Sequence, residues 1–181
     1  MAAIAAERAA EVVSQQWGEH LITSWNRHHW IDLPLSVGDK IGRLIGAAPG
    51  QVVCCDSTSV NLFKVLCAAL SLQPKRHTVL SVNGNFPTDL YMVEGLSQLT
   101  GAQHCQLKLV EDTELEAAIN EEVAVLMLTQ VDFRSGRLFD MAKLTRLAQD
   151  KGALVIWDLA HSAGALPVAL DDCNVDFAVG C

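Results

Sequence analysis

The chain has 181 residues, of which 50% are apolar, and a formal net charge of −8. This length and composition suit one globular domain and exclude a disordered protein, while the acidic balance excludes nucleic acid and anionic membrane surfaces as partners. No apolar run reaches the length of a membrane span, and Glu7, Arg8 and Glu11 interrupt the first segment, so a cytoplasmic protein is predicted.

Residues 1–50 are expected to form an N-terminal helical segment and its connection to the rest of the chain. Residues 2–17 have helical spacing, residues 21–34 look like a connecting region, and an amphipathic helix is predicted from Val37 to Ala47. Gly50 then marks the boundary with the second part, residues 51–181.

Residues 51–181 alternate between strand and helix patterns. The helices are predicted from the "DSTS" cap at residues 56–59, from Pro87, from "DTELEAAIN" and from "DMAKLTRLAQDKG". The strands are predicted at "QVVCC", "TVLSV", "QHCQLKLV", "VAVLMLTQV", "ALVIWDLA" and "VDFAVGC". This alternation indicates an α/β fold with a mostly parallel sheet and helices on both faces.

The six cysteines form no C-x-x-C pair and have no histidine at finger-like spacing. A structural zinc site therefore lacks its sequence signature, and no metal is predicted. Free thiols are the expected state.

Polar groups follow several of the predicted strands at their carboxyl ends, where parallel sheets bind ligands. Asp158 ends one strand, and its carboxylate either caps the next turn or faces a cation. The hydroxyl-rich helix start at residues 56–59 can hold a phosphate, Phe86 offers a flat face near Asp89, and Thr129 ends a buried strand. Together they indicate a flat, phosphorylated heteroaromatic cation, pyridoxal 5′-phosphate, whose ring nitrogen a buried aspartate keeps protonated.

Four segments carry a family resemblance: "DSTSVNLFKVL", "NFPTDLYMVEGL", "MLTQVDFRSGRLFDM" and "IWDLAHSAGALPVAL". They closely resemble the bacterial kynureninases, which are fold-type I (aspartate aminotransferase-like) pyridoxal-phosphate enzymes, and similar segments run from residue 24 to residue 181. The resemblance implies that residues 51–181 are part of the cofactor-binding large domain. It also implies a homodimer that hydrolyses L-kynurenine, with 3-hydroxykynurenine as a second candidate substrate, to anthranilate or 3-hydroxyanthranilate and L-alanine in tryptophan degradation.

The resemblance also implies roles for individual residues. Ser57 and Thr58 match the family's phosphate-loop hydroxyls, Phe86 the aromatic that stacks on the cofactor ring, and Asp158 the partner of the ring nitrogen. Further cofactor contacts are implied for Asp89, Thr129 and His161, and loop-shaping roles for Asn85, Pro87 and Thr88. Trp25 is a candidate neighbour of the substrate's aromatic ring, with a buried structural tryptophan as the alternative.

One departure from the family pattern concerns the lysine that forms the Schiff base. In the family this lysine follows the strand that matches "VDFAVGC", in a Tyr-Lys pair, and the sequence stops at Cys181. We therefore expect a sequence cut from a longer protein, inactive by itself, whose catalytic residue lies outside it. A cysteine desulfurase-like lyase and a non-catalytic fragment are the alternative interpretations.

Overall fold

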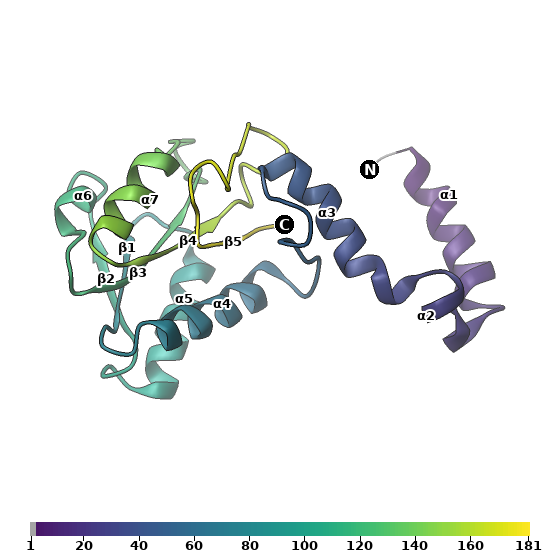
Figure 1. The fold of residues 1–181 in the computed structure, drawn as a ribbon, viewed down its shortest axis with the longest axis horizontal. Helices are drawn as coiled ribbons and strands as arrows, with labels where there is room; N and C mark the ends of the chain where they lie inside the picture. Colours follow the sequence, from purple (N-terminus) through teal and green to yellow (C-terminus); the bar gives the residue numbers. More distant parts are fainter. Residues whose placement is uncertain (1–2) are drawn as a thin grey trace.

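The computed structural model describes residues 3–181, and its N-terminal part is a series of short helices. Helix α1 (Ile4–Glu11) runs into a π-helical turn, η1 (Val12–Trp17), so the helix predicted over residues 2–17 changes its geometry midway, and its residue 2 lies outside the described residues. The predicted connection contains η2 (Leu21–Thr23), α2 (Ser24–Arg27) and η3 (Trp30–Asp32). Figure 1 shows α1 and α2 standing apart from the sheet, at the far end of α3.

Helix α3 (Leu33–Ile45) connects this part to the sheet. It begins at Leu33 rather than at the predicted Val37, because Pro34 occupies its first turn, where a proline costs no hydrogen bond. Its C-terminal end is fixed by the amide of Leu170, which donates to the Ile45 carbonyl at 3.0 Å.

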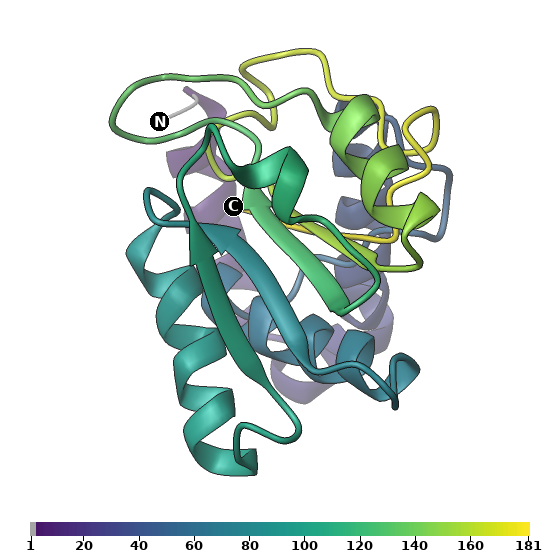
Figure 2. The ribbon, with the colours of Figure 1, turned by 90° about the vertical axis from the view of Figure 1, so that its left-hand side faces the viewer.

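A five-stranded parallel sheet forms the centre of the remaining chain, in the order β2-β1-β3-β4-β5. Its strands are β1 (Thr78–Val82), β2 (Gln106–Val110), β3 (Val123–Thr129), β4 (Leu154–Asp158) and β5 (Phe177–Val179). Its helices are α4 (Thr58–Leu72), α5 (Pro87–Thr100), α6 (Leu115–Ala118) and α7 (Met141–Asp150). The predicted α/β fold with a mostly parallel sheet is confirmed, and Figures 1 and 2 show helices on both of its faces.

Two apolar layers, one on each face of the sheet, hold the fold together. On one face, Leu62 and Leu66 of α4 and Val93 of α5 pack with Met127 of β3. On the other, Leu144 of α7 packs with Trp157 and with further sheet residues. Every residue of β3 is buried, which explains its continuous apolar sequence, since helices cover both sides of a central parallel strand.

The strand-like pattern of "QVVCC" was misleading, because residues 51–55 form no strand. This segment packs against α3 instead, and the amide of Cys54 donates to the Pro34 carbonyl at 2.9 Å. A Cβ atom at Gly38 would lie 2.0 Å from the Val52 carbonyl oxygen, so the contact depends on a glycine. The helix predicted at "DTELEAAIN" is also shorter than expected, since only the four residues of α6 are helical.

The buried hydrogen bond from the Trp157 indole to the Thr145 hydroxyl, 3.0 Å long, joins β4 to α7. In the full-length protein, Thr145→Val removes the acceptor while keeping the side-chain shape, and it leaves the indole N–H unpaired. We expect the free energy of unfolding to fall by about 1–3 kcal/mol in urea denaturation. Thr145→Ser keeps the hydroxyl and is the matched control; equal losses for the two variants would contradict this explanation.

Candidate functional site

The carboxyl ends of β1, β3 and β4 meet at one edge of the sheet, and the side chain of Asn85 joins two of them. Thr129, the last residue of β3, is the register partner of Asp158 in β4. The Asn85 side-chain oxygen accepts hydrogen bonds from the Thr129 amide at 3.1 Å and the Thr129 hydroxyl at 2.8 Å, and its nitrogen donates to Ser81 at 3.1 Å. The resemblance assigned Asn85 only a loop-shaping role, so this tie between strands was missed.

Two acidic side chains are buried near these hydrogen bonds of Asn85. Asp158 is 3% exposed and Asp89, in the first turn of α5, is 2% exposed. Burial and, after it, the negative charge of Asp158 raise the pKa of Asp89 to about 7. Burial also raises the pKa of Asp158, although the Ala160 amide and the charge of His161 act in the opposite direction.

The simpler of the two interpretations of Asp158 describes part of its surroundings. One carboxylate oxygen accepts a hydrogen bond of 2.8 Å from the Ala160 amide, which is the turn cap that the simpler interpretation expected. The neighbouring acid has a buried oxygen, Asp89 Oδ2, for which residues 3–181 offer no donor other than a proton shared with Asp158. A cation that brings an N–H donor would take the place of this shared proton, so the two buried acids fit a protonated pyridine nitrogen.

Aromatic rings lie at the same edge of the sheet. Phe86 is the N-cap residue of α5, directly before Pro87 and Thr88 in its first turn, and its ring centroid lies 5.9 Å from that of His161. The structure adds Phe133, whose centroid is 5.1 Å from that of Phe86. Sequence reasoning missed Phe133, although its position in the loop that follows Thr129 was a usable signal.

Ser57 and Thr58 lie at the start of α4. The Ser57 hydroxyl caps the helix by accepting from the Val60 amide at 3.4 Å. Just before them, Asp56 has a positive φ of 47° and forms an ion pair with Lys64. Within residues 3–181, no hydrogen bond or ion pair joins Ser57 or Thr58 to the two acids. Their phosphate contacts stay a prediction, to which the free N–H groups of the first helical turn add a general preference for anions.

Trp25 is not brought to this edge of the sheet. It belongs to α2, which stands apart from the strands in Figure 1, and it is 48% exposed. Its predicted place beside the substrate's aromatic ring therefore stays a prediction.

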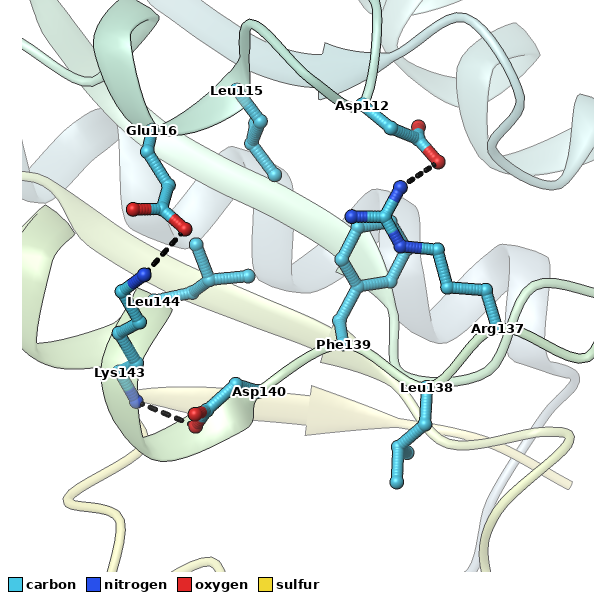
Figure 3. A pocket seen from close by; sticks show the side chains of 9 residues that line it. All are labelled: Asp112, Leu115, Glu116, Arg137, Leu138, Phe139, Asp140, Lys143 and Leu144. Atoms are coloured by element: carbon cyan, nitrogen blue, oxygen red, sulfur yellow. Dashed lines mark hydrogen bonds and ion pairs between the residues drawn. The ribbon is translucent and has the colours of Figure 1, made fainter.

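A cavity of about 230 Å³ lies elsewhere, between α6, the start of α7 and the loop before α7 (Figure 3). Its charged groups pair with one another: Arg137 with Asp112 at 2.5 Å and Lys143 with Glu116 at 2.6 Å. None of the predicted site residues lines it. The acid pair, rather than this cavity, is therefore the candidate functional site.

The acid pair makes stability depend on pH in the protein without cofactor. Because the folded state holds the Asp89 proton up to about pH 7 while the usual pKa is 3.8, stability should fall as the pH rises between these values. We expect Asp89→Asn to remove this loss and to raise the free energy of unfolding at pH 8 by on the order of 1–3 kcal/mol. Melting temperatures of the full-length apo protein from pH 5 to pH 8 test this, with the exposed Asp150→Asn as control; parallel curves for wild type and Asp89→Asn would refute it.

Comparison with known proteins shows the family to which the chain belongs. The family model "Aminotransferase class-V" matches residues 35–180. The kynureninase of Pseudomonas fluorescens is 48% identical over 179 residues, which cover 96% of this chain and 43% of that protein, so the predicted resemblance is confirmed.

Two solved structures share the fold. A NifS-like protein superposes with a TM-score of 0.72 at 16% identity, covering 95% of this chain and 49% of its own. A cysteine desulfurase from Thermococcus onnurineus NA1 superposes with a TM-score of 0.69 at 22% identity, covering 97% of this chain and 45% of its own. The chain therefore belongs to the aminotransferase class-V family of pyridoxal-phosphate-dependent enzymes.

Proposed function

We propose that this chain is the cofactor-binding part of a kynureninase, which hydrolyses L-kynurenine to anthranilate and L-alanine. The chain spans less than half the length of the curated kynureninases that it matches, so the complete reaction requires residues that it does not contain. The observation that carries the proposal is the buried pair of Asp89 and Asp158 at the carboxyl end of the sheet, with Asp89 in the first turn of the helix that begins after Phe86. Hydrolysis of 3-hydroxykynurenine is part of the same proposal.

Pyridoxal phosphate, when bound, supplies an electron sink for the reaction. Asp158 would hold the proton at the ring nitrogen, and the bound cation would in turn favour the charged form of Asp89, which burial otherwise disfavours. The Asn85 amide keeps Thr129 in place beside Asp158. These groups are fixed before any ligand arrives, which is how a protein site stabilises charge without reorganising.

Other parts of the chain would hold the rest of the cofactor. Ser57, Thr58 and the first amides of α4 would bind the phosphate, because a helix N-terminus attracts anions. Phe86 would stack on the ring face, with His161 as a further neighbour. Pro87 and Thr88 start α5 and so set the direction in which Asp89 enters the site.

The division of the chain at residue 50 is also retained as a proposal. The Asp171 amide donates to the Gly46 carbonyl at 2.9 Å, and Ile45 belongs to the core on the α7 face of the sheet. The end of α3 therefore packs against the sheet, so residues 1–50 and 51–181 are in contact there.

We further propose a homodimer in the cytoplasm. The N-terminal helices expose several large apolar side chains, among them Trp17 (62% exposed), Ile22 (75%) and Leu35 (56%), and a surface of this kind is typical of a protein interface. All six cysteines are free, which fits a reducing compartment. Among residues 3–181, no helix is long and apolar enough to cross a membrane.

A cysteine desulfurase-like lyase is the alternative that the solved structures suggest, but likeness at 16–22% identity concerns the fold alone. A non-catalytic fragment is the other. Within the chain, Lys64, Lys143 and Lys151 are each ion-paired with an acid away from Asp158, so none of these three is free to serve as the Schiff-base lysine.

The full-length protein, incubated separately with L-kynurenine and L-cysteine, distinguishes these functions. We expect anthranilate, which is followed by its fluorescence, and no sulfide above background. Sulfide release without anthranilate would replace kynureninase by the desulfurase alternative. Absence of both products from a protein that binds pyridoxal phosphate would leave the non-catalytic interpretation.

The role of Asp158 gives a sharper prediction. Asp158→Asn in the full-length protein removes the carboxylate that holds the ring proton, and we expect kcat to fall by about 100-fold or more while the cofactor still binds. Cofactor binding is measured from absorbance and kcat from anthranilate formation. Asp150→Asn is the control for the loss of a carboxylate on the surface. Near-normal kcat for Asp158→Asn would refute the assignment.

A further inference from the structure

The loop between β3 and α7 is a hairpin whose shape is set by its own hydrogen bonds. Val131 and Leu138 form an antiparallel bridge, and the Gly136 amide donates to the Asp132 carbonyl at 2.9 Å. The Asp132 carboxylate accepts from the amide of Ser135 at 2.6 Å and from its hydroxyl at 2.7 Å. Gly136 has a φ of 70°, a conformation that favours glycine. The tip of the hairpin is therefore held by hydrogen bonds within the loop.

This hairpin carries Phe133 to two of the predicted cofactor residues. The Phe133 and Phe86 rings meet edge to face, with centroids 5.1 Å apart and planes at 76°. The Phe133 and His161 rings are nearly parallel, with centroids 6.5 Å apart and planes at 27°. Three loops, which follow β1, β3 and β4, thus each contribute one ring, and Phe133 remains 41% exposed.

Arg134 contacts both Phe133 and the loop after β1. Its guanidinium carbon lies 5.4 Å from the Phe133 ring centroid, a cation–π contact. The same guanidinium lies against Gly84, where a Cβ atom would come within 2.6 Å of Nη2. Because Gly84 belongs to the turn that leads to Phe86, Arg134 connects the hairpin to the loop after β1.

We propose that Phe133 is a positioning residue, which fixes the ring planes of Phe86 and His161 for the cofactor. The inference rests on the proposed function, since it assumes that Phe86 stacks on pyridoxal phosphate. The backbone of Phe86 is fixed at the start of α5, but its ring can still turn about the side-chain bonds. An edge-to-face contact selects one ring orientation, and a ring already in place loses less entropy when the ligand binds.

The affinity of the full-length apo protein for pyridoxal phosphate tests this proposal. We expect Phe133→Ala to raise the Kd about three- to tenfold, the value of one aromatic pair. Phe133→Tyr keeps the ring and should restore the wild-type Kd. Leu138→Ala is the matched control, because Leu138 lies in the same hairpin, is 56% exposed and has no ring.

The intensity of the bound cofactor's circular-dichroism band gives a second measurement that a structural role alone would not change. We expect the band to weaken in Phe133→Ala and to recover in Phe133→Tyr. A Kd for Phe133→Ala that equals that of Leu138→Ala, or one tighter than wild type, would overturn the proposal. If the wild type binds pyridoxal phosphate but forms no anthranilate, the proposed function fails, while the ratio of these Kd values still decides the role of Phe133.

Discussion

The electrostatic repulsion between two buried carboxyl groups is the constraint on which this structure depends. Asp89 and Asp158 are both buried away from water, and this burial, followed by the negative charge of Asp158, raises the pKa of Asp89 to about 7. A fold that only had to be stable would fill this space with apolar side chains. Keeping two acids there is understandable if a cation completes the site, as in enzymes that bind a protonated ring.

The parallel sheet brings this site together from distant parts of the chain. Asn85, Thr129 and Asp158 follow or end three adjacent strands, and all three strands run in the same direction. Their carboxyl ends therefore meet at one edge, where the apolar core stops and polar groups can gather. The helices contribute through their N-termini: α4 presents its first amides beside Ser57, and α5 directs Asp89 inward.

Much of the fold followed from the sequence, because the central strands are buried and helices α4 and α7 have side-chain caps. The continuous apolar run of β3 and the Asp140 cap of α7 are local signals that need no knowledge of distant contacts. The failure at "QVVCC" has the opposite cause, since its packing against Gly38 depends on a residue outside the segment. In the site, Asp158 was predictable as an acid after a strand, whereas the hydrogen bonds of Asn85 and the ring of Phe133 depend on how three loops meet.

The bonds of Asn85 have a consequence for chemical ageing. This amide acts as acceptor toward Thr129 and as donor toward Ser81, and the side chain is only 4% exposed. Hydrolysis of the Asn85 side-chain amide would give a carboxylate, which accepts hydrogen bonds but donates none. The hydrogen bond to Ser81 would therefore lose its donor. It would also add a third negative group next to two that already repel each other. Slow deamidation of Asn85 would thus weaken the side-chain link between β1 and β3 and also change the charge of the site. The burial of Asn85 protects against both effects.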